Sequence, residues 1–326
     1  MSTTSAIRHR QPAGVPVGGQ FATKSNPESD LDLDIAPVAG VDGSAPTLKE
    51  LDRDERIKAM QAEIERAMDT MANPDGWRDF LEHASKFHNY SLNNAMLIRW
   101  QCPEATRVAG FNTWKQHGRT VKKGESAIFI LAPIVKKFED AENPDDPSAS
   151  RVVGFRTAAV FDVSQTEGDP LPEPPAIPRS DLDDGSAPDG MVEDLQSRID
   201  GLGFSVSYRK LPEGTGGYTS FGTNEVVISD SRNRREQART LAHEAAHIAL
   251  GHGDRVAEYH SGFADARPDM EVEAESVAYI VSRHWGLDEV GGASFNYIDS
   301  WALGDAERVK RTATAVLKGA RALLAE

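Results

Sequence analysis

The sequence predicts an α+β protein of two domains, and three observations lead to this prediction. The chain has 326 residues, of which 39% are hydrophobic, which is enough for two hydrophobic cores. Each half contains segments with helical periodicity beside segments rich in β-branched and aromatic residues. A stretch with six prolines among many acidic residues, 168–190, separates the halves and has the composition of a linker.

These compositions divide the chain into four predicted segments. Residues 1–46 are rich in glycine and proline and contain little to bury, which predicts a disordered tail. Residues 47–167 are expected to form the first domain, a small mixed α/β unit. Residues 191–326, beyond the 168–190 linker, are expected to form a second, mostly helical domain.

The first domain is expected to open with three helices. Thr47-Leu48-Lys49-Glu50 has the pattern of a capping box, which places the first ordered residues there. Apolar residues then recur at steps of three and four over 57–71, which predicts a helix whose methionines pack in the core. Asn73-Pro74-Asp75-Gly76 ends this helix, a second is expected over 77–87, and Ser91 is the expected N-cap of a third.

The remaining elements are predicted from local composition. Four segments carry the β-branched and aromatic residues typical of strands: 126–134, 151–163, 204–208 and 225–229. A helix is expected over 192–202, and further helices are expected between the last strand and the C-terminus.

Charge, cysteine content and hydropathy exclude several classes of protein. The net charge of −15 argues against a protein that simply coats nucleic acid. The single cysteine, Cys102, excludes an intramolecular disulfide framework and a cysteine-based zinc ribbon. No apolar run approaches the roughly 20 residues of a membrane helix, and the N-terminus has no apolar signal core. We therefore expect a cytoplasmic protein without a membrane partner.

A metal site is indicated by the segment Leu241-Ala242-His243-Glu244-Ala245-Ala246-His247. Positions i and i+4 of a helix share one face, so His243 and His247 can bind the same ion. Glu244 is then placed to act as a general base toward a water molecule at the metal and afterwards as a proton donor. Asp230 or Ser231 is the expected N-cap of this helix, and Gly251 or Gly253 its terminator.

The third metal ligand is expected on a later helix. His252 follows His243 by nine residues rather than by the ten of the metzincin pattern, which disfavours that class. Glu271 and Glu275 flank the apolar face of the helix around 271–278, whereas Glu273 points away and is expected in solvent. We therefore expect Glu271 as the ligand and Glu275 as the acceptor that orients a ligand histidine, with the exchange of these two roles left open.

These residues resemble a known family. His243-Glu244-X-X-His247 followed by Glu271-X-Glu273-Ala274 is similar to the gluzincin-like peptidase domain of the ImmA/IrrE group. The segment Glu271–Gly286, followed by Phe295-Asn296-Tyr297-Ile298-Asp299-Ser300-Trp301, resembles the C-terminal domain of ArdC-type antirestriction proteins. The resemblance implies a zincin-like metallopeptidase domain.

One region of the first domain has a charge opposite to that of the whole chain. Between Asp75 and Lys137 ten basic residues face five acidic ones. Aromatic and amide side chains lie among the bases, as in Phe87-His88-Asn89-Tyr90-Ser91 and Phe111-Asn112-Thr113-Trp114-Lys115. Aromatic faces can stack on unpaired bases while lysine and arginine follow the phosphates, a combination that suits single strands. Trp114, Phe87 and Phe111 are each expected in the core rather than at such a surface.

This region also resembles ArdC-type proteins. The similar segments are 87–94, 110–124 with Trp114-Lys115-X-X-Gly118, and 160–166. In that family the N-terminal domain binds single-stranded DNA. The resemblance and the charge pattern together give the expected DNA-binding residues: His88, Asn89, Tyr90, Ser91, Asn94, Trp114, Lys115, Arg119, Lys122, Lys123 and Gln165.

The expected function is that of an antirestriction-type protein of a mobile element. It would bind single-stranded DNA and hydrolyse a peptide bond with Zn²⁺, or another divalent metal, at His243, His247 and Glu271. The partners would be single-stranded DNA and a protein substrate or restriction enzyme. Three alternatives remain: an ImmA-like protease that cleaves a repressor, a DNA-binding protein with a structural zinc, and an acidic mimic of DNA.

Overall fold

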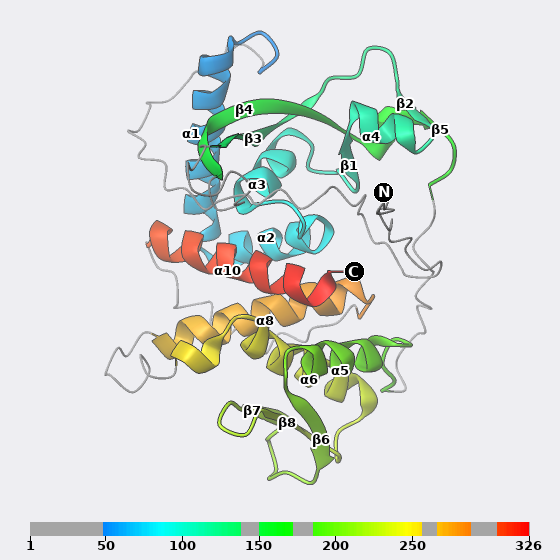
Figure 1. The fold of residues 1–326 in the computed structure, drawn as a ribbon, viewed down its shortest axis with the longest axis vertical. Helices are drawn as coiled ribbons and strands as arrows, with labels where there is room; N and C mark the ends of the chain where they lie inside the picture. Colours follow the sequence, from blue (N-terminus) through cyan, green and yellow to red (C-terminus); the bar gives the residue numbers. More distant parts are fainter. Residues whose placement is uncertain (1–47, 138–149, 172–184, 256–265, 288–304, 326) are drawn as a thin grey trace, which may run out of the picture.

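The computed structural model describes residues 48–137, 150–171, 185–255, 266–287 and 305–325 (Figure 1). The chain begins with three helices, α1 (Arg53–Met71), α2 (Pro74–Phe87) and α3 (Leu92–Gln101). The expected methionine stripe is confirmed, because Met60, Met68 and Met71 are buried. Ser91 caps α3 as predicted.

The predicted capping box of the first helix is wrong by a few residues. Asp52 is the N-cap of α1, and its carboxylate accepts hydrogen bonds from the backbone N–H groups of Asp54 and Glu55. The Glu55 carboxylate in turn accepts from the Asp52 N–H, which completes a capping box. Two successive patterns in the sequence fit the same signal, and only the downstream one starts the helix.

Three small antiparallel pairings follow α3. The elements are β1 (Val108–Gly110), α4 (Phe111–Gln116), β2 (Arg119–Val121), β3 (Ile128–Lys137), β4 (Ser150–Asp162), the single 3₁₀ turn η2 (Val163–Gln165) and β5 (Thr166–Gly168). One sheet has the order β1-β4-β3, and β2 pairs with β5 separately. The two predicted strands correspond to β3 and β4, whereas β1, β2 and β5 are too short to show a sequence pattern.

Two amide side chains of α3 dock this helix on the outer edge of β3. The Asn94 amide donates to the Leu131 carbonyl and accepts from the Leu131 N–H, both at 2.9 Å. Gln101 makes the same pair of bonds with Phe129, both at 2.8 Å. Backbone groups on a strand edge otherwise need another strand or water, so α3 closes the β1-β4-β3 sheet on this side.

The second half contains a three-stranded sheet with helices above it. Its elements are α5 (Met191–Gly201), β6 (Ser205–Arg209), β7 (Gly217–Ser220), β8 (Glu225–Ser229), α6 (Arg234–Ala249), α8 (Ala266–His284) and α10 (Ala306–Leu324). The order is β6-β8-β7, with β6 parallel and β7 antiparallel to β8. The predicted helix and two predicted strands are confirmed as α5, β6 and β8. The edge strand β7 was not predicted.

The two halves pack against each other and share one core. Figure 1 shows α8 and α10 across the middle of the molecule, between the first three helices and the lower sheet. The indole N–H of Trp77 on α2 donates to the Ser276 hydroxyl on α8 at 3.1 Å, and both side chains are buried. Arg321 on α10 donates to the backbone carbonyls of His88 and Tyr90. The fold is therefore mixed α/β with two parts joined by a buried interface.

Some sequence predictions fall outside the described residues. These are the 1–46 tail, the segment Phe295–Trp301 and most of the 168–190 linker. The last linker residues, 185–190, are described, and the first of them contacts α6, where the Arg235 N–H donates to the Gly185 carbonyl at 2.9 Å. Among the described residues, no helix has both the length and the apolar character needed to cross a bilayer.

Candidate metal centre

Helix α6 presents the two predicted histidines on one face. Its N-cap is Asn233, which forms a capping box with Glu236, so the predicted N-cap, Asp230 or Ser231, is wrong by two to three residues. The helix ends at Ala249, and Gly251 adopts a φ of +66°, a left-handed conformation that favours glycine. This agrees with Gly251 as the predicted terminator. His243 and His247 therefore lie one turn apart on a helix that is fixed at both ends.

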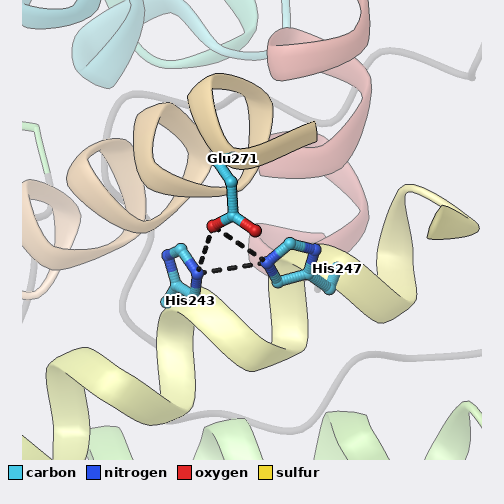
Figure 2. Close-up of side chains that lie close together, drawn as sticks. All are labelled: His243, His247 and Glu271. Carbon is cyan, nitrogen blue, oxygen red and sulfur yellow. Dashed lines mark hydrogen bonds and ion pairs between the residues drawn. The ribbon is translucent and has the colours of Figure 1, made fainter. Parts of the chain in front are cut away.

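Three side chains converge on one point between α6 and α8. Figure 2 shows the carboxylate of Glu271, from α8, directed between the rings of His243 and His247. The Nε2 atoms of the two histidines are 3.1 Å apart, and Glu271 Oε2 lies 3.6 Å from the first and 3.9 Å from the second. Within the described residues, these three side chains form the group whose ligand atoms lie close enough to hold one metal ion.

The chemistry of this donor set fits a divalent metal. Ligand atoms of a tetrahedral zinc ion lie about 3.4 Å apart, because each bond is about 2.0–2.1 Å long. The three separations observed here, 3.1, 3.6 and 3.9 Å, lie around that value. The opposite nitrogen of each imidazole has its own hydrogen-bond partner, so both Nε2 atoms face the same point. Two imidazoles and one carboxylate form a ligand set that zinc and related metals bind.

In each of the two histidines, the ring nitrogen that faces away from Glu271 has its own hydrogen-bond partner. His243 Nδ1 lies 2.9 Å from Glu275 Oε2, and the other oxygen of Glu275 accepts from Arg239 at 2.9 Å. This is the orienting role predicted for Glu275. His247 Nδ1 instead lies 2.7 Å from Nδ1 of His252, whose Nε2 lies 2.9 Å from Glu273 Oε2.

The prediction that Glu273 is solvated is wrong. The helical geometry correctly directs Glu273 away from Glu271 and Glu275, but the residues that follow α6 cover that face. Glu273 is only 5% exposed, and its carboxylate contacts His252 and, at 2.6 Å, the guanidinium of Arg255. A helical wheel gives the direction of a side chain, whereas its burial depends on which segment packs there.

Glu244 lies beside the cluster and is held by a residue that the sequence did not indicate. The Thr219 hydroxyl, on the edge strand β7, donates to Glu244 Oε2 at 2.7 Å. Burial raises the pKa of Glu244, while the His243 charge and this hydrogen bond oppose the rise. No motif marks Thr219, because its contact depends on β7 packing against α6.

The charges of the cluster shift the pKa values of its two histidines in opposite directions. Burial opposes protonation of His243, but the carboxylates of Glu271 and Glu275 outweigh it and raise the His243 pKa to about 10. Burial and the neighbouring His243 charge lower the pKa of His247 to about 3. The carboxylates thus hold one positive charge at the two imidazoles. Because metals bind neutral imidazole, a divalent cation would replace this proton.

The residues predicted to bind DNA have three kinds of environment. His88, Asn94 and Trp114 are buried. The Asn94 amide forms hydrogen bonds with the backbone of Leu131 on β3, and the Trp114 indole donates to the Phe161 carbonyl at 2.9 Å. The His88 ring lies against the ring of His284. Half-buried residues are Tyr90, Ser91, Arg119 and Gln165. Exposed residues are Asn89, Lys115, Lys122 and Lys123.

The half-buried residues serve the fold of the first half. The Tyr90 hydroxyl donates to the Val108 carbonyl, and Gln165 joins the Asp162 N–H to the Ser126 carbonyl. The Arg119 guanidinium donates to the hydroxyl and the carbonyl of Thr166. Phe111, expected in the core, is instead 50% exposed on α4.

Comparisons with known protein families match both halves. Residues 54–161 match the N-terminal domain of anti-restriction factor ArdC, and residues 199–281 match the IrrE N-terminal-like domain. The chain is thus similar to ArdC in its first half and to the IrrE group in its second. The two matched ranges lie inside the two predicted domains, and the second contains His243, His247 and Glu271.

The individual proteins similar to this chain are distant from it in sequence. An uncharacterized protein of Bacillus anthracis is 25% identical over 289 residues, which cover 78% of this chain and 48% of that protein. The chain thus spans about half the length of this curated relative. Two crystal structures of antirestriction protein ArdC from the R388 plasmid are also similar. Their sequence identity to this chain is 20% for the metal-free structure and 18% for the Mn(II)-bound structure. Both comparisons cover 71% of this chain and 82% of that one, with TM-scores of 0.45 and 0.44.

Proposed function

We propose that the second half is a metal-dependent peptidase domain. The observation that carries the proposal is the convergence of His243, His247 and Glu271 beside a buried carboxylate, Glu244, that Thr219 holds in place. Zn²⁺ is the expected ion, and the same ligand set suits other divalent metals. A bound ion would act there as a Lewis acid toward a peptide carbonyl and toward water.

The residues of the chain supply the proton transfers. Glu244 accepts a proton from the attacking water and returns it to the leaving amine. The raised pKa that burial gives this carboxyl suits both steps, since a group that must accept and release a proton works best when its pKa lies nearer to neutrality. The Thr219 hydroxyl occupies one lone pair of Oε2 and so fixes the orientation of the carboxylate.

Metal binding and catalysis are tested separately. Elemental analysis of the purified full chain should find about one equivalent of metal, and His243→Ala should lose it. Glu244→Gln should keep the metal and lose peptidase activity, by about 10²–10⁴-fold. The assay uses candidate restriction enzymes and repressors as substrates, with and without single-stranded DNA. Cleavage of a repressor alone would favour an ImmA-like protease, and metal without any cleavage would favour a structural zinc.

We further propose that the first half binds single-stranded DNA at the exposed face of α4 and the β2 loop. Phe111 and Lys115 are exposed and lie four residues apart on α4, which places a ring and a positive charge side by side. Lys123 is exposed after β2, where Gly124 has a φ of +96°. Rings stack on bases while cations follow the phosphates, without sequence preference. This assigns the stacking role to Phe111 rather than to buried Trp114.

Binding of labelled oligonucleotides tests this surface. We expect a preference for single strands over duplex and a linear fall of log affinity with log salt, by about 0.7 per phosphate contact. Replacement of Lys122 and Lys123 together by alanine should therefore reduce the slope by about 1.4, whereas the exposed Lys318→Ala on α10 should leave it unchanged. Equal slopes for both variants would place the DNA elsewhere.

A further inference from the structure

A line of hydrogen bonds extends from His247 away from the metal centre. His247 Nδ1 lies 2.7 Å from His252 Nδ1, and His252 Nε2 lies 2.9 Å from Glu273 Oε2. Arg255 Nη1 completes the line, at 2.6 Å from the same carboxylate oxygen. The four residues come from two segments: the end of α6 with the turn beyond it, and helix α8.

Both central members of this line are buried. The side chains of His252 and Glu273 are 2% and 6% exposed. Burial of a carboxylate is costly unless it is paired and hydrogen-bonded, and Glu273 has both an arginine and an imidazole as partners. The imidazole hydrogen bond connects this ion pair to His247 and so to the metal centre.

The direction of each hydrogen bond follows from the donor inventory. An ionised carboxylate can only accept a hydrogen bond, so His252 Nε2 carries a proton and donates it in a hydrogen bond to Glu273. The other nitrogen of a neutral His252 is then an acceptor, and His247 Nδ1 must donate to it. His247 is left with its lone pair on Nε2, the atom that faces His243 and Glu271. The line thus selects the tautomer that a metal requires.

The two ligand histidines are therefore held by different means. Glu275 contacts His243 directly, whereas His247 reaches its carboxylate through a second imidazole. We propose that His252 and Glu273 are positioning residues that fix His247 for metal binding. This inference rests on the proposed metal function. It assigns the short helical segment after α6, up to Arg255, a role at the metal site.

The test uses the full-length chain and two variants of nearly constant volume. His252→Phe keeps a ring but removes both nitrogens, and Glu273→Gln keeps the shape but removes the charge. The exposed Glu307→Gln on α10 is the matched control. Partners beyond the ligands typically change metal affinity by about 10–100-fold. We expect Zn²⁺ affinity, measured by competition with a chromophoric chelator, to fall by that factor in His252→Phe and by less in Glu273→Gln, whose amide oxygen still accepts.

A second readout separates positioning from a merely structural role. The ¹⁵N shifts of the His247 ring report which nitrogen carries the proton in the metal-free protein. We expect His252→Phe to move the proton from Nδ1 toward Nε2, while circular dichroism stays that of the wild type. If His252→Phe does not fold, Glu273→Gln carries the same test of affinity and shift.

The outcomes are distinguishable from failure of the proposed function. If the wild type binds Zn²⁺ and His243→Ala does not, the metal centre stands. Unchanged Zn²⁺ affinity in both His252→Phe and Glu273→Gln would then overturn the positioning role alone. If Glu273 acts only through His252, the double variant His252→Phe/Glu273→Gln should lose no more Zn²⁺ affinity than His252→Phe alone. Additive losses of affinity would contradict this order of action.

Discussion

The buried contact between Trp77 and Ser276 predicts that the two halves unfold together. Trp77 is fully buried on α2, and its indole N–H donates to Ser276, which is 1% exposed on α8. Ser276→Ala leaves this N–H without that acceptor, which costs about 1–3 kcal/mol of unfolding free energy for a buried group. The larger change Trp77→Ala should cost about 3–5 kcal/mol, because it also leaves a cavity. Both variants should destabilise elements on either side of the interface.

Hydrogen exchange at increasing denaturant, read by mass spectrometry, measures this prediction. Peptides from α3 and from α5 should lose protection at the same denaturant concentration in the wild type. In Ser276→Ala both should shift together, with a fall in melting temperature of about 2–4 °C for each kcal/mol. The exposed Lys318→Ala is the control. A shift confined to the α5 peptides would refute the shared core and support two independent domains.

Three further predictions concern single residues. Burial lowers the pKa of His88 to about 4, below the ordinary 6.5, so the stability it contributes is complete above pH 6.5 and lost as pH falls toward 4. Unfolding free energies of the wild type should fall over this window by on the order of 3 kcal/mol more than those of His88→Gln. Zn²⁺ at a hundred times its Kd should stabilise the wild type by about 2.7 kcal/mol in thermal or denaturant unfolding, and Glu271→Ala by nothing measurable. Thr219→Val should keep the Zn²⁺ affinity in chelator competition and lower peptidase turnover, because Glu244 loses its orienting donor; unchanged turnover would contradict this role.

The convergence of His243, His247 and Glu271 was predictable because it depends on local geometry. The spacing of His243 and His247 fixes their common face once the segment is helical, and the period of α8 separates Glu271 from Glu273. The same reasoning distinguishes Glu271 from Glu275 less well, since both flank one face. The structure directs Glu271 to the two Nε2 atoms and Glu275 to the rear of His243.

Apart from Glu275, the supporting residues were not predictable, because their partners are distant in the chain. Thr219 meets Glu244 only because the edge strand β7 packs on α6. Asn94 has the amide expected of a contact with a DNA base. Its NH₂ group instead donates to the Leu131 carbonyl, and its oxygen accepts from the Leu131 N–H. A polar side chain shows from sequence what it can bond, and the fold decides which partner it bonds.

The composition of the linker predicts separable halves, yet the buried surface lies in the helices. Residues 168–190 are acidic and proline-rich, but α8 and α10 contact helices of both halves. Ser276 and Glu271 lie on the same helix α8, one bonded to the first half and the other directed to the metal centre. A change in how α8 packs against α2 is therefore expected also to move Glu271, the third residue of the proposed metal site. Removal of the first half would expose the surface around Ser276 that it now covers, so a fragment that begins near Gly190 is expected to hold its metal less tightly than the whole chain.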